Sequence, residues 1–186
     1  MSPKYTIIKR LSVVIAAIGF TVASQAQAFD AAKLDAEVNA TMATFLKEQP
    51  DASDIMGKAR GTLVCPKITK GGFGFGAAHG KCELFVSGQT KDYYGYSAVK
   101  WGFLAGISSY SLIMVFNDEA ALGKFRSDNR EWEVGADVNV AVAKKGAGGV
   151  LDTNNVKEPV VAFIFGEKGL MADASLKGGR FKKLDK

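Results

Sequence analysis

Residues of the kinds that bind metals or attack substrates are scarce in this chain. It has one histidine, His79, and two cysteines, Cys65 and Cys82, in 186 residues. Zinc sites draw most of their four ligands from these residue types, and the two cysteines lack C-x-x-C spacing. No serine or cysteine is spaced with a histidine and an aspartate as in a recognisable triad, and the carboxylates are scattered. The sequence therefore predicts no metal, no cofactor and no enzymatic activity.

A strong excess of one charge is also lacking. The chain has 24 basic and 19 acidic residues, a net charge of +5. Residues 1–28 contain three basic residues and no acidic one, so the remainder carries 21 − 19 = +2. This balance gives no bulk electrostatic case for nucleic acid binding. Phosphate loops of the form G-x-x-x-x-G-K-[S/T] do not occur, and the run Gly74 to Gly80 is one residue too long for the dinucleotide fingerprint.

The first 28 residues have the pattern of a cleaved signal peptide. Cationic residues near the start precede an apolar run from Leu11 to Val22, and Ala26-Gln27-Ala28 has the small-x-small form of a cleavage site. The apolar run is shorter than the roughly 20 residues of a membrane-spanning helix. We expect a mature protein that starts at Phe29, folds as a single domain over 29–186 and is periplasmic or secreted.

Residues 66–84 are rich in glycine, but their pattern is not that of a flexible linker. Phe73 and Phe75 stand two residues apart, which is typical of one face of a strand. The glycines around them fall on the other face, where no side chain separates the backbone from a neighbour. We therefore expect a strongly bent strand at the centre of the β-structure, covered closely by a helix or another sheet.

Hydrophobic periodicity predicts three helices and many short strands. A first helix capped by Asp30 runs to about Glu48, a second covers about 51–60 with Gly61 as its C-terminal cap, and a third covers Glu119 to Arg126. The first helix is amphipathic and could lie on a membrane, but its polar face carries Asp and Glu in place of a Lys/Arg majority, which favours packing on the domain's own sheet. The expected strands are 62–65, 73–77, 81–86, a longer region from 93, 111–116, 132–142, 160–165, 170–176 and 180–184. This pattern indicates an α+β fold with a curled antiparallel β-sheet or barrel-like β core, two N-terminal helices and one inserted short helix.

Basic residues form two sets that could face an anionic surface. The first set lies around the glycine-rich strand and comprises Lys58, Arg60, Lys67, Lys70 and Lys168. The second crowds the C-terminus and comprises Lys177, Arg180, Lys182, Lys183 and Lys186. For any single lysine a solvated surface is the simpler explanation, but several acting together suit anionic headgroups. The sequence does not rank the two sets.

Cys65 and Cys82 flank the glycine-rich strand. In an oxidising compartment an even number of cysteines favours a disulfide. The bond requires the two residues to lie in register, since Cα atoms more than about 7 Å apart cannot be bridged without backbone movement.

Several runs of the chain, in the same order, resemble the SYLF domain, also called the Ysc84 actin-binding domain. They extend over about residues 51–184, nearly all of the expected mature chain. The matching runs are 57–76, Gly102-Phe103-Leu104-Ala105-Gly106, 111–116 with 119–125, Trp132-Glu133-Val134-Gly135, Gly146-Ala147-Gly148-Gly149 and 166–178.

The resemblance implies a lipid-binding module without enzymatic activity. Eukaryotic members bind phosphoinositide-containing membranes and some, fused to SH3 domains, also bind actin, whereas bacterial members are typically stand-alone exported domains. This chain has no SH3 domain and carries an export signal, so actin is an unlikely partner. The function expected is binding of anionic phospholipid in the periplasm or outside the cell, through the first basic set. The alternative is a structural or protein-interaction domain of the cell envelope.

Overall fold

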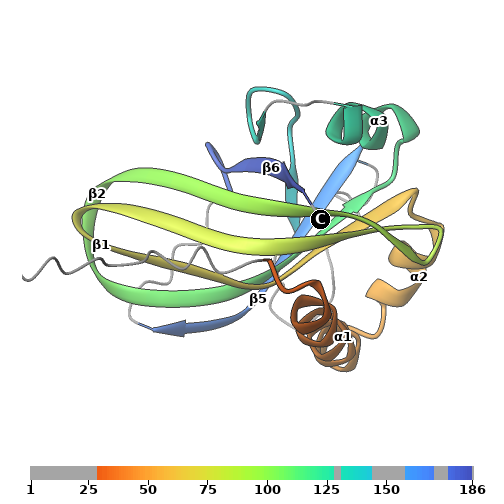
Figure 1. Cartoon of the computed structure of the whole chain (residues 1–186), viewed down its shortest axis with the longest axis horizontal. Coiled ribbons are helices and arrows are strands. Elements are labelled where there is room, and N and C mark those ends of the chain that lie inside the picture. Colours follow the sequence, from red (N-terminus) through yellow and green to blue (C-terminus); the bar gives the residue numbers. More distant parts are fainter. Residues whose placement is uncertain (1–28, 128–130, 144–157, 170–175, 186) are drawn as a thin grey trace, which may run out of the picture.

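The computed structural model describes residues 29–127, 131–143, 158–169 and 176–185, with the side chains of 100–105 left aside. Three helices accompany one sheet in these ranges (Figure 1). In chain order the elements are α1 (Ala31–Glu48), α2 (Ala52–Lys58), β1 (Gly61–Val86), β2 (Gln89–Phe116), α3 (Glu119–Ser127), β3 (Trp132–Glu133), β4 (Ala141–Ala143), β5 (Val160–Gly169) and β6 (Arg180–Leu184).

A long hairpin of β1 and β2 dominates the fold. The two strands have 26 and 28 residues and pair antiparallel from Gly61↔Phe116 to Val86↔Gln89, where Ser87 and Gly88 form the turn. The paired ribbon bends back on itself, so each strand has two limbs. Figure 1 shows the bend at the end of the molecule away from the three helices. We call this end the ribbon tip; it contains residues 71–77 of β1 and 99–107 of β2.

Glycine makes the bend possible. A Cβ on Gly72 would stand 2.1 Å from the carbonyl oxygen of Phe75, and Gly74 has a φ of 77°. The register shifts by a bulge between Phe73 and Phe75, which turns the strand more sharply than regular pairing allows. A strand could therefore not turn back here with side chains at these positions.

A disulfide joins the two limbs of β1. Cys65 and Cys82 are bonded with their Cα atoms 4.1 Å apart, and both are fully buried. Next to them, a Cβ on Gly80 would lie 2.9 Å from the carbonyl oxygen of Lys67. The limbs thus touch backbone to backbone, and the predicted disulfide is confirmed as the link across the folded ribbon.

The remaining strands pair with the second strand of the hairpin. β6 pairs with residues Tyr93–Ser97 of β2, and β5 pairs with the other limb of β2, up to Phe116. The strand order is therefore β3-β6-β2-β5-β4, and β1 pairs with β2 as well. All these pairs are antiparallel except β4 with β5. The sheet is therefore mixed but mostly antiparallel and curled, which confirms the predicted α+β class.

Two apolar clusters hold the sheet and helices together. One lies inside the folded ribbon; it contains both cysteines together with Leu63, Leu84 and Leu112, and it extends to α3. Its aromatic end joins Tyr94, Phe116, Phe125, Trp132 and Phe181, with ring centroids of neighbours 4.5 to 6.5 Å apart. The other cluster lies between the sheet and α1, which buries Leu34, Val38 and Phe45. The first helix thus packs on the domain's own sheet, as its periodicity predicts.

Aspartates cap the starts of α1 and α3, and the cap of α1 was predicted. The Asp30 side chain accepts a hydrogen bond from the Lys33 N–H at 3.0 Å, and Asp118 accepts one from the Ala121 N–H at 2.8 Å. The predicted cap at Gly61 is wrong, because this glycine begins β1. A Cβ there would lie 2.8 Å from Leu122, so the close approach of α3 explains it better than a helix end.

Two predictions about strands are wrong. The three strands expected within 62–86 are one bent strand, because the glycines form a bend and a bulge that keep the ladder intact. The strand expected over 132–142 is interrupted: Gly135 has a φ of 94°, and Asp137 accepts a hydrogen bond from the Glu133 N–H at 2.7 Å, which makes a turn. Most of the strand expected over 170–176 lies outside the described residues.

The predicted cover over the glycine-rich segment is also wrong. A Cβ on Gly74 would meet nothing within 4 Å, and the side chains of Phe73 and Phe75 are 86% and 63% exposed. The glycines allow the backbone to turn on itself, so the neighbour they approach is the same strand. This segment ends the ribbon instead of lying at its centre.

Candidate functional site

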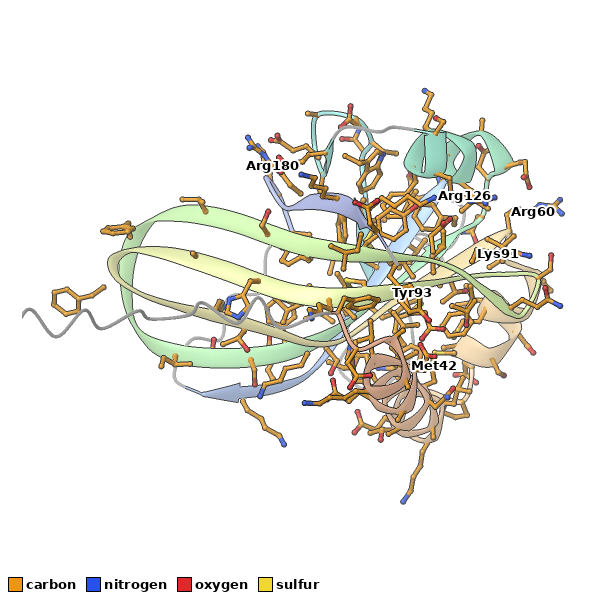
Figure 2. The ribbon with its side chains drawn as sticks, in the orientation of Figure 1. Met42, Arg60, Lys91, Tyr93, Arg126 and Arg180 are labelled. Atoms are coloured by element: carbon orange, nitrogen blue, oxygen red, sulfur yellow. A yellow bond between two sulfur atoms is a disulfide. The ribbon has the colours of Figure 1, made fainter. Side chains whose placement is uncertain are left out.

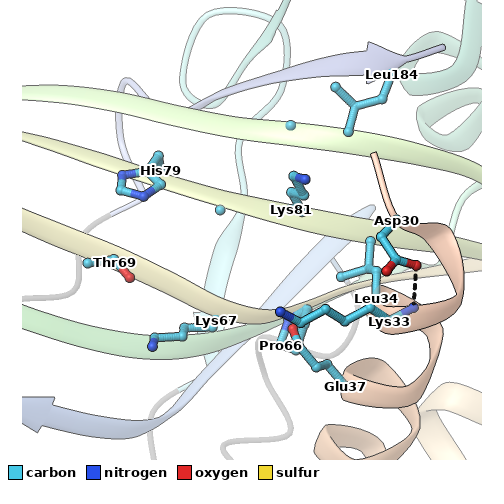
Figure 3. Close-up of a pocket in the computed structure, with 12 residues that line it drawn as sticks. Asp30, Lys33, Leu34, Glu37, Pro66, Lys67, Thr69, His79, Lys81 and Leu184 are labelled. Atoms are coloured by element: carbon cyan, nitrogen blue, oxygen red, sulfur yellow. Dashed lines mark hydrogen bonds between the residues drawn. The ribbon is translucent and has the colours of Figure 1, made fainter. Parts of the chain in front are cut away.

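The face of the ribbon beside α1 carries a hollow of about 720 Å³ between the start of that helix and the two limbs of β1. Figure 3 shows Lys33, Lys67, His79 and Lys81 around it. These side chains come from α1 and from both limbs of β1, so the fold-back of the strand brings them together. The other lining residues are Asp30, Leu34, Glu37, Pro66, Thr69, Gly80, Gly95 and Leu184.

A second hollow, of about 520 Å³, adjoins the first and shares Pro66 and Lys67 with it. Lys168 lines it from β5, where it pairs in register with Ser109 of β2. Lys67 therefore stands between the two hollows. We refer to Lys33, Lys67, Lys81 and Lys168 as the α1-side lysines.

The α1-side lysines differ from the other cations in their electrostatic surroundings. Within the described ranges, none of the ion pairs closer than 4 Å involves them. The ammonium of Lys81 lies 5.1 Å from the centre of the Phe29 ring, a cation–π contact. Three acids line the same two hollows: Asp30, which caps α1, Glu37 and Glu48. The four ammonium groups outnumber these acids, and the positive face that results suits an anionic ligand.

Two residues of the C-terminal basic set, Arg180 and Lys183, are paired with acids. Arg180 lies 3.0 Å from Glu133 and 3.6 Å from Glu131, and Lys183 lies 2.5 Å from Asp92. Lys177 and Lys182 are exposed, and Lys186 lies outside the described residues. Pairing lowers the positive potential that this set presents, so the structure favours the α1 side as the cationic face.

The five residues of the first predicted set do not form one patch. Lys67 and Lys168 meet at the second hollow, whereas Lys70 is only 9% exposed. Lys58 and Arg60 are exposed at the end of the molecule that carries α2, far along the ribbon from its tip; Figure 2 labels Arg60 there. Sequence reasoning missed Lys33 and Lys81. The predicted disulfide was the available signal for Lys81, because a bond from Cys65 to Cys82 places Lys81 near Lys67.

A buried acidic group lies where α1 meets the hairpin. Glu83 is 1% exposed and accepts a hydrogen bond from the Thr90 hydroxyl. Burial, reinforced by the negative charge of Asp35, raises the pKa of Glu83 above its ordinary value. The Tyr93 hydroxyl donates to Asp35 at 2.8 Å, and burial together with this contact raises the pKa of Tyr93 to about 12.

Replacing Glu83 with glutamine is expected to stabilise the protein at neutral pH. Because the pKa of Glu83 is raised in the folded state, its contribution to the free energy of unfolding is fully present below the ordinary pKa of 4.5. That contribution is lost as pH rises through the pKa of the folded state. Glutamine keeps an acceptor for Thr90 and cannot ionise. Thermal unfolding from pH 4 to 8 should show an advantage of Glu83→Gln that grows with pH. Glu37→Gln, an exposed change on α1, is the control. If both variants change stability equally at every pH, the raised pKa of Glu83 is contradicted.

Metal and membrane-spanning features are not found in the ranges described. No group of three or more histidine, cysteine, aspartate or glutamate residues there could hold a metal ion. No helix within these ranges combines the length and the apolar character that crossing a bilayer requires.

Comparison with known proteins finds a family that is similar to the second half of the chain. No curated protein matches the sequence. A family model described as Ysc84, Las17-binding protein actin regulator, matches residues 97–186, a little under half of the chain. The match extends from the second strand of the hairpin to the C-terminus and includes Lys168 but not the other α1-side lysines. This family consists generally of non-catalytic binding domains associated with lipid or actin binding. Residues 97–186 are therefore similar to the Ysc84 family, also called the SYLF domain family.

Proposed function

We propose that this protein is an exported, non-enzymatic module that binds anionic phospholipid through its α1-side lysines. The observation that carries the proposal is the convergence of Lys33, Lys67, Lys81 and Lys168 on two adjoining hollows, without an ion pair to any described acid. The family's association with lipid binding supports the same conclusion.

The expected binding is weak for a single lysine and substantial for the set. Each Lys or Arg near an anionic membrane surface contributes about 1 kcal/mol, so four acting together give about 4 kcal/mol, roughly a thousandfold in partitioning. The attraction falls with salt, because the Debye length shortens from about 10 Å at 0.1 M to about 3 Å at 1 M. Hollows of this size also leave room for a phosphate-bearing headgroup between the lysines.

Reversing two of these charges should abolish most of the binding at low salt. We expect Lys67→Glu/Lys168→Glu to reduce binding to vesicles of phosphatidylcholine and phosphatidylglycerol by at least a hundredfold, because two attractive terms become repulsive. Vesicle sedimentation at about 0.1 M salt measures this.

Two control variants test the location of the site. Lys182→Glu changes an exposed lysine of the C-terminal set, and Lys58→Glu/Arg60→Glu changes the pair at the α2 end. Both should weaken binding only slightly, through net charge. Equal losses for all three variants would show that bulk charge and not the α1 side binds the vesicle. Wild-type protein that ignores anionic vesicles at low salt would refute the function.

Export is part of the proposal. The amino-terminal pattern and the disulfide both fit an oxidising compartment outside the cytoplasm. N-terminal sequencing of the exported protein is expected to begin at Phe29. Protein recovered outside the cytoplasm with Met1 intact would contradict the cleavage.

A further inference from the structure

The bent part of the hairpin contains no acidic residue. From Gly61 to Cys82 in β1 and from Tyr93 to Phe116 in β2 the sequence has no aspartate or glutamate. Both acids of the hairpin, Glu83 and Asp92, lie near its turn, at the end opposite the ribbon tip. Lysine is the charged residue of the acid-free segments, at positions 67, 70, 81 and 100. β5 adds Lys168 together with one acid, Glu167.

Large apolar side chains are exposed at the ribbon tip. Among the described residues, the exposed large hydrophobic side chains are Phe73, Phe75, Val99 and Ile107, at 86%, 63%, 67% and 75%. Their register partners lie in the same bend, since Phe73 pairs with Ala105, Ala77 with Val99 and Gly71 with Ile107. Elsewhere in the described ranges apolar side chains of this size are covered. Apolar exposure concentrated at one end marks an interaction surface.

We propose that the ribbon tip inserts into the apolar boundary of an anionic bilayer, with Phe73, Phe75, Val99 and Ile107 as the inserted side chains. This inference rests on the proposed function and adds a penetrating element to its electrostatic one. Lys67, Lys81 and Lys168 then lie behind the tip, at the depth of the headgroups. Aromatic and aliphatic side chains in front of cations match the bilayer, whose apolar interior lies beneath an anionic surface.

The same charges disfavour a second copy of the chain as the occupant. Two ribbon tips meeting end to end would bring two acid-free, lysine-bearing segments together, and like charges repel. A bilayer of anionic lipid supplies the opposite charge. It also accepts a bent ribbon without a shaped pocket, and the two phenylalanines are exposed at the bend.

The test combines a tip variant with a lysine variant. Phe73→Ala/Phe75→Ala changes two exposed side chains and should leave thermal stability unchanged. On phosphatidylcholine–phosphatidylglycerol vesicles it should lose binding by about a hundredfold or more, the value for two buried aromatic side chains. At about 1 M salt, where lysine attraction is screened, wild type should retain residual binding that the tip variant lacks. Phe73→Trp/Phe75→Trp should restore binding.

The possible outcomes separate this inference from the proposed function. If wild type binds anionic vesicles, Lys67→Glu/Lys168→Glu abolishes binding and the tip variant binds like wild type, the site is electrostatic and insertion is refuted. If wild type does not bind, both proposals fall. Sedimentation equilibrium addresses self-association: a wild-type dimer that the tip variant dissociates, with vesicle binding unaffected, would assign the tip to a second copy and overturn insertion.

Fluorescence measures depth directly. With Trp101 replaced by phenylalanine, the remaining native tryptophan is the buried Trp132. In this background Phe73→Trp should shift its emission to the blue on anionic vesicles and be quenched by lipids brominated in their acyl chains. Lys182→Trp, an exposed position on β6, should show neither change in the same background. An emission from position 73 that does not respond to vesicles that the protein demonstrably binds would refute insertion.

Discussion

Replacing Cys65 and Cys82 together with alanine is expected to lower the free energy of unfolding by roughly 3 kcal/mol. The two residues are separated by 17 positions, and closing a loop of that size restricts the unfolded chain by about this amount in the chain-entropy account. Both residues are fully buried in the cluster inside the ribbon, so removing the sulfur atoms also costs packing. Urea unfolding of the oxidised wild type and the variant measures the difference.

Reduction provides the matched control. A thiol reductant should shift the unfolding midpoint of wild type toward that of the double variant and leave the variant itself unchanged. Equal midpoints for the oxidised and reduced wild-type protein would contradict a stabilising role for the bond.

Replacing Gly72 with alanine is expected to destabilise the protein by about 1–3 kcal/mol, the usual cost of forcing extra volume into a packed site. The added methyl would stand 2.1 Å from the Phe75 carbonyl oxygen and 2.5 Å from the Gly76 Cα, and both are backbone atoms that cannot rotate away. The bend must therefore open, which also moves the limbs that the disulfide joins. Thermal and urea unfolding measure the loss.

Gly123→Ala adds the same methyl to the middle of α3, where nothing lies within 4 Å of the new atom. Alanine favours a helix over glycine by about 0.5–1 kcal/mol, so this variant should be slightly more stable than wild type. Opposite signs for the two substitutions are the expected result. A neutral Gly72→Ala would show that the bend tolerates side chains and that the glycines serve another purpose.

Local signals in the sequence predicted the helices and buried strands because their causes are local. Asp30 and Asp118 cap helices by contacting N–H groups three residues away, and the apolar run 111–116 is buried on both faces. The alternating valines of 132–142 misled the prediction, since a turn at Gly135 interrupts the strand in spite of the pattern. Periodicity shows which side chains suit a sheet, but it does not show the backbone torsion of Gly135, and that torsion interrupts the strand.

The candidate site was only partly predictable because it depends on the fold-back of one strand. Lys67 and Lys168 were predicted as members of the basic set around the glycine-rich strand. Lys33 and Lys81 join them only because the limbs of β1 cross and α1 packs beside them. Lys70 was predicted as a surface cation, but it follows buried Ile68 by two positions and therefore shares its face. Strand alternation, applied to these two residues, would have identified it as largely covered.

The pairing of β2 has a consequence for the order in which the chain folds. The hairpin can form as soon as its own residues are available, but the free edge of β2 finds its partners only in β5 and β6, and Tyr93 pairs with Leu184. Pairings this far apart in sequence form slowly, because a long loop must close first. Until β5 is made, the apolar strand 111–116 presents an open edge, and Tyr93–Ser97 does so until β6 is made. The time needed to deliver the C-terminus thus sets how long a newly made chain is exposed to incorrect strand pairing.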